Sequence, residues 1–498
     1  MICYLVGIVT LFFTRKIFLD NLGETFIGLT GTLQSLLGFL NLAELGVSTA
    51  IAYVLYKPLF DGDEDKIKEI IAVLGFLYRC VGYFILCGGV IFSFFLPLIF
   101  NNITIDLGVV YFGFYAYLFS SLLGYLVNYR VALLSADQKN YLVTGYYQLT
   151  SSLKAIVQMG FAIYLQNFYL FLFIEMTFAI INSVILNWKI NQTYPWLKLK
   201  GYNGRKLLKK YPVIGVKIRQ LVIHRIASFV QYQIMPFFVY SYVSLPMVAL
   251  YGNYSLITQR LEGFLASVSN GLFAGVGNLI AEGNKEKIIW LYKELMVSRI
   301  AISSILVICL FNLLSPLIIV WLGPEYELSQ TFVLLISIAS FLNLCRSTTD
   351  QFVSGYGLFG DIWAPVAEMG IYIISALILG PIYGLNGLVL SPIISLGIVL
   401  YIWKPYWLFS RGFKIPVIKY WLCIIRYLIP SVIIFIAVPM VCNYVMTPAQ
   451  ISSGWLQLIE GGMLYFSVSL IMVIGGLSIL FTEMRSFLKR FLNNKIFR

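Results

Sequence analysis

Residues 40–70 read LNLAELGVSTAIAYVLYKPLFDGDEDKIKEI. The stretch is predicted to be an apolar helix that carries Asn41 and Glu44 three residues apart, so both side chains lie on one face. The helix is predicted to break at Lys57-Pro58 into a short loop that mixes acids and lysines. This stretch is the reference for the rest of the sequence, because parts of it recur in the second half of the chain.

A weaker copy of this pattern lies in the second half of the chain, over residues 274–288 (AGVGNLIAEGNKEKI). The GV and IA pairs within residues 46–52 recur in the same order within residues 275–281. Two further matches follow in the same order: KI at 66–67 with 287–288, and PLI at 97–99 with 316–318. The order predicts two related halves, an arrangement that many membrane transporters share.

The composition is that of a membrane protein. Charged residues make up 11% and hydrophobic residues 60%, whereas soluble proteins contain about 25% charged residues. Apolar runs of about 20 residues recur from end to end, which predicts an all-α integral membrane protein and not a β-barrel. The net charge of +13 falls mostly in the connections between these runs, so no nucleic-acid partner is expected.

No chemistry of catalysis or metal binding emerges from the sequence. The seven cysteines show no CxxC spacing, and His224 is the single histidine, which excludes a multi-histidine metal site. The chain has no Walker loop and no Ser/His/Asp arrangement. We therefore expect no enzyme activity, no metal and no cofactor.

About fourteen transmembrane helices are predicted, the first of them running from the short apolar start through Arg15 and Lys16 to about Leu19. The others are expected over residues 26–56, 70–100, 108–134, 141–165, 169–188, 218–242, 248–281, 300–322, 331–356, 362–380, 385–403, 420–442 and 455–482. The predicted domains are an N-terminal six-helix bundle (1–190), a basic linker (191–217), a C-terminal six-helix bundle (218–403), and two further helices with a basic tail (404–498).

Basic residues predict the orientation. Of the 35 Lys and Arg residues, 26 fall in six segments, which are 57–69, 135–141, 189–219, 282–299, 404–419 and 483–498. The alternate connections, among them 18–25 and 381–384, hold none. The basic segments and both termini are therefore expected on the cytoplasmic side. Segment 189–219 is either an interfacial helix that holds anionic headgroups or a solvated linker.

Several cations remain within the predicted spans, where a charge costs at least about 2.5 kcal/mol. A net cationic cavity could hold an anion such as a phosphate, and its candidate residues are Arg15, Arg79, Lys154, Arg225, Arg260 and Arg346. Structural ion pairing is the alternative for Arg346, because Asp350 follows it by four residues. Arg299, at the end of a basic segment, is the counterpart of Arg79 in the second half.

Polar side chains within the spans are candidates for sugar binding or for ion coupling. They are Gln34, Asn41, Glu44, Gln231, Asn253 and Asp350. Hydrogen bonding between helices is the alternative role for each of them.

Several motifs together resemble the Wzx-type polysaccharide flippases, which belong to the superfamily of multidrug and toxin extruders and lipid II flippases. The motifs are LGE at 22–24, LAELG at 42–46, LYKPL at 55–59, LLSADQK at 133–139, YGNY at 251–254 and GVGNLIAEG at 275–283. The chain departs from this family in the seventh helix, where His224-Arg225 and the following QYQIMP stand in place of a Thr-Asp or similar pair. That departure leaves substrate choice and any coupling-ion site open.

The resemblance implies two six-helix bundles facing each other in a V, with two helices appended, and a central cavity that opens to each side in turn. The implied substrate is an undecaprenyl-diphosphate-linked oligosaccharide repeat unit for O-antigen, capsule or exopolysaccharide, whose pyrophosphate the cavity cations would hold. Coupling to H⁺, Na⁺ or the membrane potential, and partnership with polymerase and chain-length proteins of the same pathway, are also implied, in the bacterial inner membrane.

Two rival functions make different predictions. A drug exporter of the extruder branch predicts an acid-centred site, for which Glu44 and Asp350 are the residues. A membrane oligosaccharide polymerase or ligase predicts a sizeable outer loop with Arg and His. The outer connections of this chain are short and lack Lys, Arg and His, which argues against the enzyme.

Overall fold

The structure is a computed structural model, and it describes residues 2–40, 47–100, 105–137, 139–212, 214–215, 233–270, 279–280, 283–358, 360–361 and 363–492. Over these residues the chain is built from helices and contains no β-strand. Eight helical segments of the described chain are long and apolar enough to cross a membrane. The predicted fold class is confirmed: the chain is an all-α, multi-pass membrane protein.

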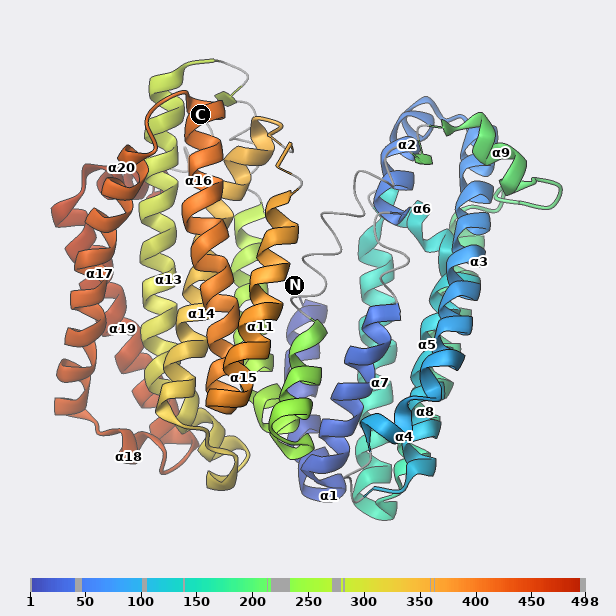
Figure 1. Cartoon of the computed structure of the whole chain (residues 1–498), viewed down its shortest axis with the longest axis horizontal. Coiled ribbons are helices and arrows are strands. Elements are labelled where there is room, and N and C mark those ends of the chain that lie inside the picture. The colour runs from blue at the N-terminus through green and yellow to red at the C-terminus, as the bar shows by residue number, and fades with distance from the viewer. Residues whose placement is uncertain are drawn as a thin grey trace. The chain divides into compact units, whose positions relative to one another are not determined.

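The chain forms two compact units, one over residues 1–249 and the other over residues 250–498 (Figure 1). The division falls within helix α11 (Leu245–Asn270), after Ala249. Because residues 216–232 lie outside the described ranges, the domain boundaries drawn from the sequence stay predictions.

Unit 1 is organised around helices α1, α5, α7 and α8: α7 packs against α1 and α8, and α5 packs against α8, α1 and α3. Its helices are α1 (Ile2–Leu40), α2 (Val47–Asp61), α3 (Glu64–Ser93), α4 (Leu96–Ile99), α5 (Leu107–Leu126), the 3₁₀ turn η2 (Asn128–Arg130), α6 (Val131–Ala136), α7 (Asn140–Leu165), α8 (Phe168–Thr193) and α9 (Gly204–Lys210).

Unit 2 is organised around the long helix α13 (Lys285–Trp321), which packs against α14, α17, α19 and α20. The other elements are η3 (Pro324–Tyr326), α14 (Gln330–Gly355), α15 (Trp363–Ile398), the π-helical turn η4 (Val399–Trp403), α16 (Lys404–Trp407), the π-helical turn η5 (Leu408–Phe413), α17 (Ile418–Val445), α18 (Pro448–Ile451), α19 (Trp455–Leu480) and α20 (Thr482–Leu492).

Two glycines divide helices that are otherwise continuous. Gly23 in α1 has φ 80° and Gly384 in α15 has φ 55°, a backbone region that residues with a Cβ rarely adopt. Both glycines lie where the sequence predicts a connection without Lys or Arg, within residues 18–25 and 381–384. The chain therefore reverses at each glycine without a loop.

The predicted helix break at Lys57-Pro58 is wrong, because α2 runs through Pro58 to Asp61. A proline inside a helix removes one backbone hydrogen bond and bends the helix without always ending it. The turn comes instead at Gly62, with φ 68°, and at Asp63, whose carboxylate accepts a hydrogen bond from the Lys66 backbone N–H at 3.1 Å.

Two of the segments predicted to be cytoplasmic loops are also mostly helical. In segment 282–299, α13 begins at Lys285, with the Asn284 side chain as its cap, so Arg299 lies inside the helix with only 7% of its surface exposed. In segment 404–419 the helical chain continues through α16 and η5 to Phe413. In both segments lysines and arginines therefore lie within helices, where the sequence predicts a loop.

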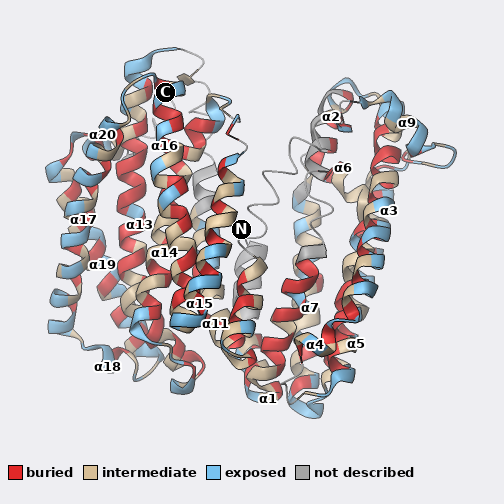
Figure 2. Cartoon of the chain, viewed as in Figure 1, coloured by how far each residue is buried: buried red, intermediate tan, exposed pale blue. Residues whose placement is uncertain are grey.

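Burial separates the centre of unit 2 from its edge (Figure 2). Most of α13 is buried, whereas α17 exposes a row of large apolar side chains that includes Ile425, Ile429 and Ile436. The spacing of four and seven residues places them on one helix face. A continuous apolar face of this length is expected of a helix that contacts lipid.

Candidate functional site

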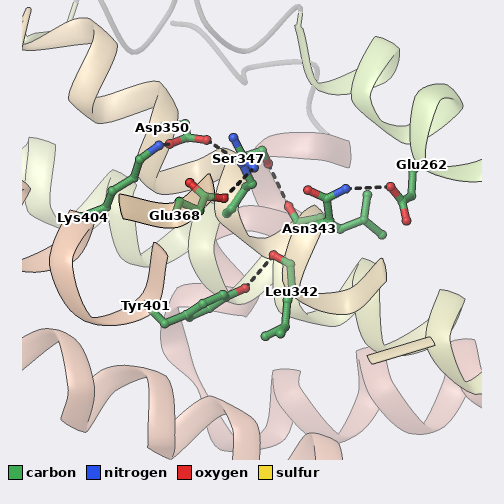
Figure 3. A network of polar contacts seen from close by, with 10 residues as sticks. Glu262, Leu342, Asn343, Ser347, Asp350, Glu368, Tyr401 and Lys404 are labelled. Atoms are coloured by element: carbon green, nitrogen blue, oxygen red, sulfur yellow. Dashed lines mark hydrogen bonds and ion pairs between the residues drawn. The ribbon is translucent and has the colours of Figure 1, made fainter. Parts of the chain in front are cut away.

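Each unit buries a group of polar side chains among apolar helices. In unit 2 the group is a charge network, which we define as Arg346 and Asp350 on α14, Glu368 on α15, and Lys404 on α16 (Figure 3). In unit 1 the group is a longer row of mostly uncharged side chains. These two groups are where a polar ligand or a coupling ion could be held at membrane depth.

Asp350 is the centre of the charge network. Its Oδ2 accepts a hydrogen bond from Arg346 Nε at 3.0 Å, and its Oδ1 accepts one from Lys404 Nζ at 2.5 Å. The Arg346–Asp350 pair expected from the four-residue spacing is therefore confirmed. Arg346 Nη1 also lies 4.0 Å from the Glu368 carboxylate, which is nearly fully buried. The network has two cations and two carboxylates, so its formal charge is zero.

Glu262 on α11 lies beside this network and has a different kind of partner. Its Oε2 accepts a hydrogen bond from Asn343 Nδ2 at 2.9 Å (Figure 3). In the described part of the chain no ion pair involves Glu262. An amide can satisfy a carboxylate, but it does not neutralise the charge.

Sequence reasoning assigned two charged residues of α13 to a loop, and both are buried. Glu294 is 1% exposed and is held by Trp290 Nε1 at 2.7 Å and by Arg490 of α20 at 3.2 Å. Arg299 lies one turn further along, and within the described ranges it forms no ion pair. The sequence does hold a signal for their position in a helix, because an apolar run begins directly after Arg299. A membrane-spanning helix can start several residues before its apolar run, within charged sequence.

The polar row of unit 1 lies on η2, α7 and α8, and we call it the polar strip. Its members are Asn128, Arg130, Thr150, Lys154, Gln158, Glu175, Asn182, Ser183, Asn187 and Asn191. Sequence reasoning singled out Lys154 among them as a site candidate. It missed the asparagines, although Asn182 follows Glu175 by seven residues on one helix face.

The end of the polar strip that lies in the interior of the helices is an ion pair. Lys154 Nζ lies 2.6 Å from Glu175 Oε1, and Gln158 Nε2 donates to Glu175 Oε2 at 3.3 Å. Next to them Thr150 Oγ1 donates to Asn182 Oδ1 at 3.0 Å. Lys154, expected among the pyrophosphate-binding cations, is therefore already paired with a carboxylate, and its role stays a prediction.

At the half-exposed end of the helices, the polar strip consists of Arg130 and three asparagines that bond to one another. Arg130 donates to Asn187 Oδ1 at 2.7 Å and to Asn191 Oδ1 at 2.8 Å. Asn187 Nδ2 in turn donates to Asn128 Oδ1 at 2.9 Å. The strip thus leads from the half-exposed end of the helices to the ion pair in their interior.

A cavity of about 220 Å³ opens along the polar strip. It is lined by Ser120, Leu123, Gly124, Asn128, Tyr147, Thr150, Ser151, Lys154, Glu175, Phe178, Ala179 and Asn182. We call it the unit 1 cavity. Polar groups at this depth must face protein, water or a ligand, because hydrocarbon cannot satisfy them.

The other predicted site residues are placed as follows. Arg15 donates from Nη2 to the Ala249 carbonyl at 2.9 Å. Arg79 is exposed on α3 and donates from Nε to the Gly75 carbonyl at 3.1 Å. Arg260 is exposed on α11, and Asn253 is buried in the same helix. Gln34 lies beside the Tyr117 hydroxyl.

Four of the predicted site residues fall outside the described ranges: Asn41, Glu44, Arg225 and Gln231. Among the residues that the structure does describe, no group of three or more His, Cys, Asp and Glu side chains could hold a metal ion.

Two solved structures are similar to this chain in fold. A lipid II flippase, MurJ in an inward closed conformation, aligns with a TM-score of 0.62 at 16% identity, over 94% of this chain and 96% of that one. A multidrug resistance transporter of the MATE family, of the MOP superfamily, in an inward-facing conformation aligns with a TM-score of 0.56 at 13% identity, over 82% and 99%. No family model and no curated protein sequence matches the chain.

Proposed function

We propose that the chain is a flippase that moves undecaprenyl-diphosphate-linked oligosaccharide repeat units from the inner to the outer leaflet of the bacterial cytoplasmic membrane. The product would feed the synthesis of a surface polysaccharide such as O-antigen, capsule or exopolysaccharide. The observation that carries the proposal is the fold likeness to a lipid II flippase over nearly the whole length of both chains. The motifs typical of the polysaccharide branch support the choice of substrate.

Exposed cations on long apolar helices support an anionic substrate. Arg79 lies within α3, between apolar stretches, and its guanidinium bonds only to its own helix among the described residues. Keeping an arginine at this depth is costly unless it meets water or an anion. A diphosphate would accept hydrogen bonds from such a group with high strength, because both partners are charged.

The proposal includes alternating access between two halves, with both termini in the cytoplasm. It also includes coupling to H⁺, Na⁺ or the membrane potential, and supply of substrate to polymerase and chain-length proteins of the same pathway. The rival is a drug exporter, for which the fold likeness to a multidrug transporter is the supporting observation. One experiment separates the two.

The test is leaflet transfer in proteoliposomes. Purified protein is reconstituted with undecaprenyl-diphosphate-linked oligosaccharide, and the substrate that reaches the opposite leaflet is measured by its accessibility to an added glycosidase. We expect transfer by the wild type and a loss of about tenfold or more in Arg79→Ala, since one hydrogen bond to a charged group contributes about 1.5–3 kcal/mol.

The matched control is Lys66→Ala. Lys66 is a cation on the same helix, but it lies in the first turn and is paired with Asp63 at 2.6 Å. We expect transfer by Lys66→Ala to equal that of the wild type. Absence of transfer by a folded wild-type protein that expels organic cations would overturn the proposal in favour of the exporter.

A further inference from the structure

The unit 1 cavity has the size of a small ligand. Its volume of about 220 Å³ is below the range of roughly 300–1,000 Å³ that drug-sized ligands occupy. It corresponds to about seven water molecules at the density of the liquid. One sugar ring fits a space of this size.

The charge of the cavity favours a neutral ligand. Lys154 and Glu175 are 2.6 Å apart, with 24% and 20% of their side chains exposed, so each cancels the charge of the other. An anion would have to separate the pair to gain the lysine, and a cation would have to separate it to gain the glutamate. A ligand with hydroxyl groups can bond to the pair without breaking it.

The remaining groups that line the cavity can both donate hydrogen bonds to hydroxyls and accept hydrogen bonds from them. Asn182 and Asn128 each accept hydrogen bonds through Oδ1, while their Nδ2 groups have no hydrogen-bond partner among the described residues. The side chains of Tyr147 and Phe178 add aromatic surface to the same cavity. Amide donors, a carboxylate and aromatic faces in one small cavity are the groups that hold a sugar, because a sugar presents hydroxyls at its edge and C–H groups on its faces.

We propose that the unit 1 cavity binds one uncharged sugar ring, with Asn182, Thr150 and the Lys154–Glu175 pair as the residues that select it. This inference rests on the proposed function, in that the sugar belongs to the oligosaccharide being moved. It separates two tasks: the diphosphate is bound by cations elsewhere, and the sugar is selected in unit 1. The residues concerned differ from the polar side chains that the sequence singled out for sugar binding.

The first experiment measures binding to the full-length protein in detergent. The probes are the methyl glycosides of glucose, galactose, mannose and N-acetylglucosamine, with inorganic diphosphate as the charged comparison, and binding is followed by saturation-transfer difference NMR. We expect at least one glycoside to bind the wild type, and Asn182→Leu and Thr150→Val to bind it about five- to tenfold more weakly.

The matched control is Thr177→Val. Thr177 lies on α8, is half-buried, does not line the cavity, and donates its hydroxyl to the carbonyl four residues earlier. Thr150 Oγ1 likewise lies 2.9 Å from the carbonyl four residues before it. Both valine variants keep the shape of threonine, so neither should fail to fold. Equal glycoside binding by Thr150→Val and Thr177→Val would show that the glycoside binds outside the cavity, and would overturn the inference. Absence of binding by the wild type would overturn it as well.

Leaflet transfer with the same variants distinguishes this inference from the proposed function. If both are correct, Asn182→Leu needs about five- to tenfold more substrate for half-maximal transfer, whereas Thr177→Val does not. Transfer that Asn182→Leu and Thr150→Val leave unchanged overturns the sugar site and keeps the flippase. Cavity-dependent glycoside binding without any leaflet transfer supports the sugar site and overturns the flippase.

Discussion

The polar strip of unit 1 and the charge network of unit 2 are both set among long apolar helices, but they use polarity in different ways. The charge network brings two cations and two carboxylates together, and Asp350 satisfies Arg346 and Lys404 at once. The polar strip has a single ion pair, is otherwise mostly amides and hydroxyls, and lines a cavity of about 220 Å³. Charges that cancel one another hold helices together, whereas amides beside open space can receive a ligand.

The comparison predicts a large loss of stability when the charge network is cut at its centre. Asp350→Asn should lower the free energy of unfolding by about 3–5 kcal/mol, because it leaves two part-buried cations close together without the carboxylate between them. Reversible unfolding of the purified protein in mixed micelles measures the effect.

Asp106→Asn is the control for this change. Asp106 bonds to the Tyr169 hydroxyl at 3.1 Å at the exposed start of α5, so its loss should cost less than about 1 kcal/mol. If Asp350→Asn is as stable as Asp106→Asn, the charge network does not hold unit 2 together, and the contrast between the units fails.

Some of this organisation could be predicted from the sequence. Arg346 and Asp350 are four residues apart on one helix, so spacing alone predicts their pair. Lys404 joins them from 54 residues further along the chain, and Lys154 meets Glu175 from the neighbouring span. No local pattern encodes such contacts between helices, because they depend on how each helix is rotated about its axis.

Hydropathy explains both what was predicted correctly about the helices and where their predicted ends are wrong. Hydropathy locates the apolar interior of each span well, and the glycine bends at Gly23 and Gly384 fall in predicted connections. The ends are less well predicted, since helices continue through Pro58 and past Lys404 into charged sequence. Arg299 was counted with a loop for this reason, although its helix begins at Lys285.

The ion pair of the polar strip should contribute less to stability than the charge network does. A double-mutant cycle of Lys154→Met and Glu175→Gln should give a coupling energy of about 1 kcal/mol, because the cycle removes one pair that borders an open cavity, whereas Asp350→Asn leaves two cations without their shared carboxylate. The same unfolding measurement applies. A coupling energy as large as the loss in Asp350→Asn would mean that the strip is structural too, and would count against a ligand in its cavity.

Asp137 gives the smallest expected effect, and it tests whether a position among membrane-spanning helices explains what such a carboxylate contributes. Like Asp350, it has two donors: Lys139 Nζ at 2.6 Å and the Tyr194 hydroxyl at 2.6 Å. Unlike Asp350, it lies at the end of α6, outside the membrane-spanning segments, although the two side chains are almost equally exposed, at 29% and 28%. Burial acts to raise the pKa of Asp137, but the two hydrogen bonds outweigh it and lower the pKa below its ordinary value.

A carboxylate whose pKa is lower in the folded state stabilises the fold above the pKa of the unfolded state, about 3.9, and that contribution is lost as the pH falls through the folded-state pKa. Asp137→Asn should therefore be less stable than the wild type by under about 1 kcal/mol at pH 6, and the deficit should shrink as the pH falls below the pKa of the unfolded state and through the lower pKa of the folded state. Unfolding of both proteins across this range measures it. A deficit at pH 6 that equals the loss in Asp350→Asn would mean that the two donors alone determine what such a carboxylate contributes, and that its position among apolar helices does not.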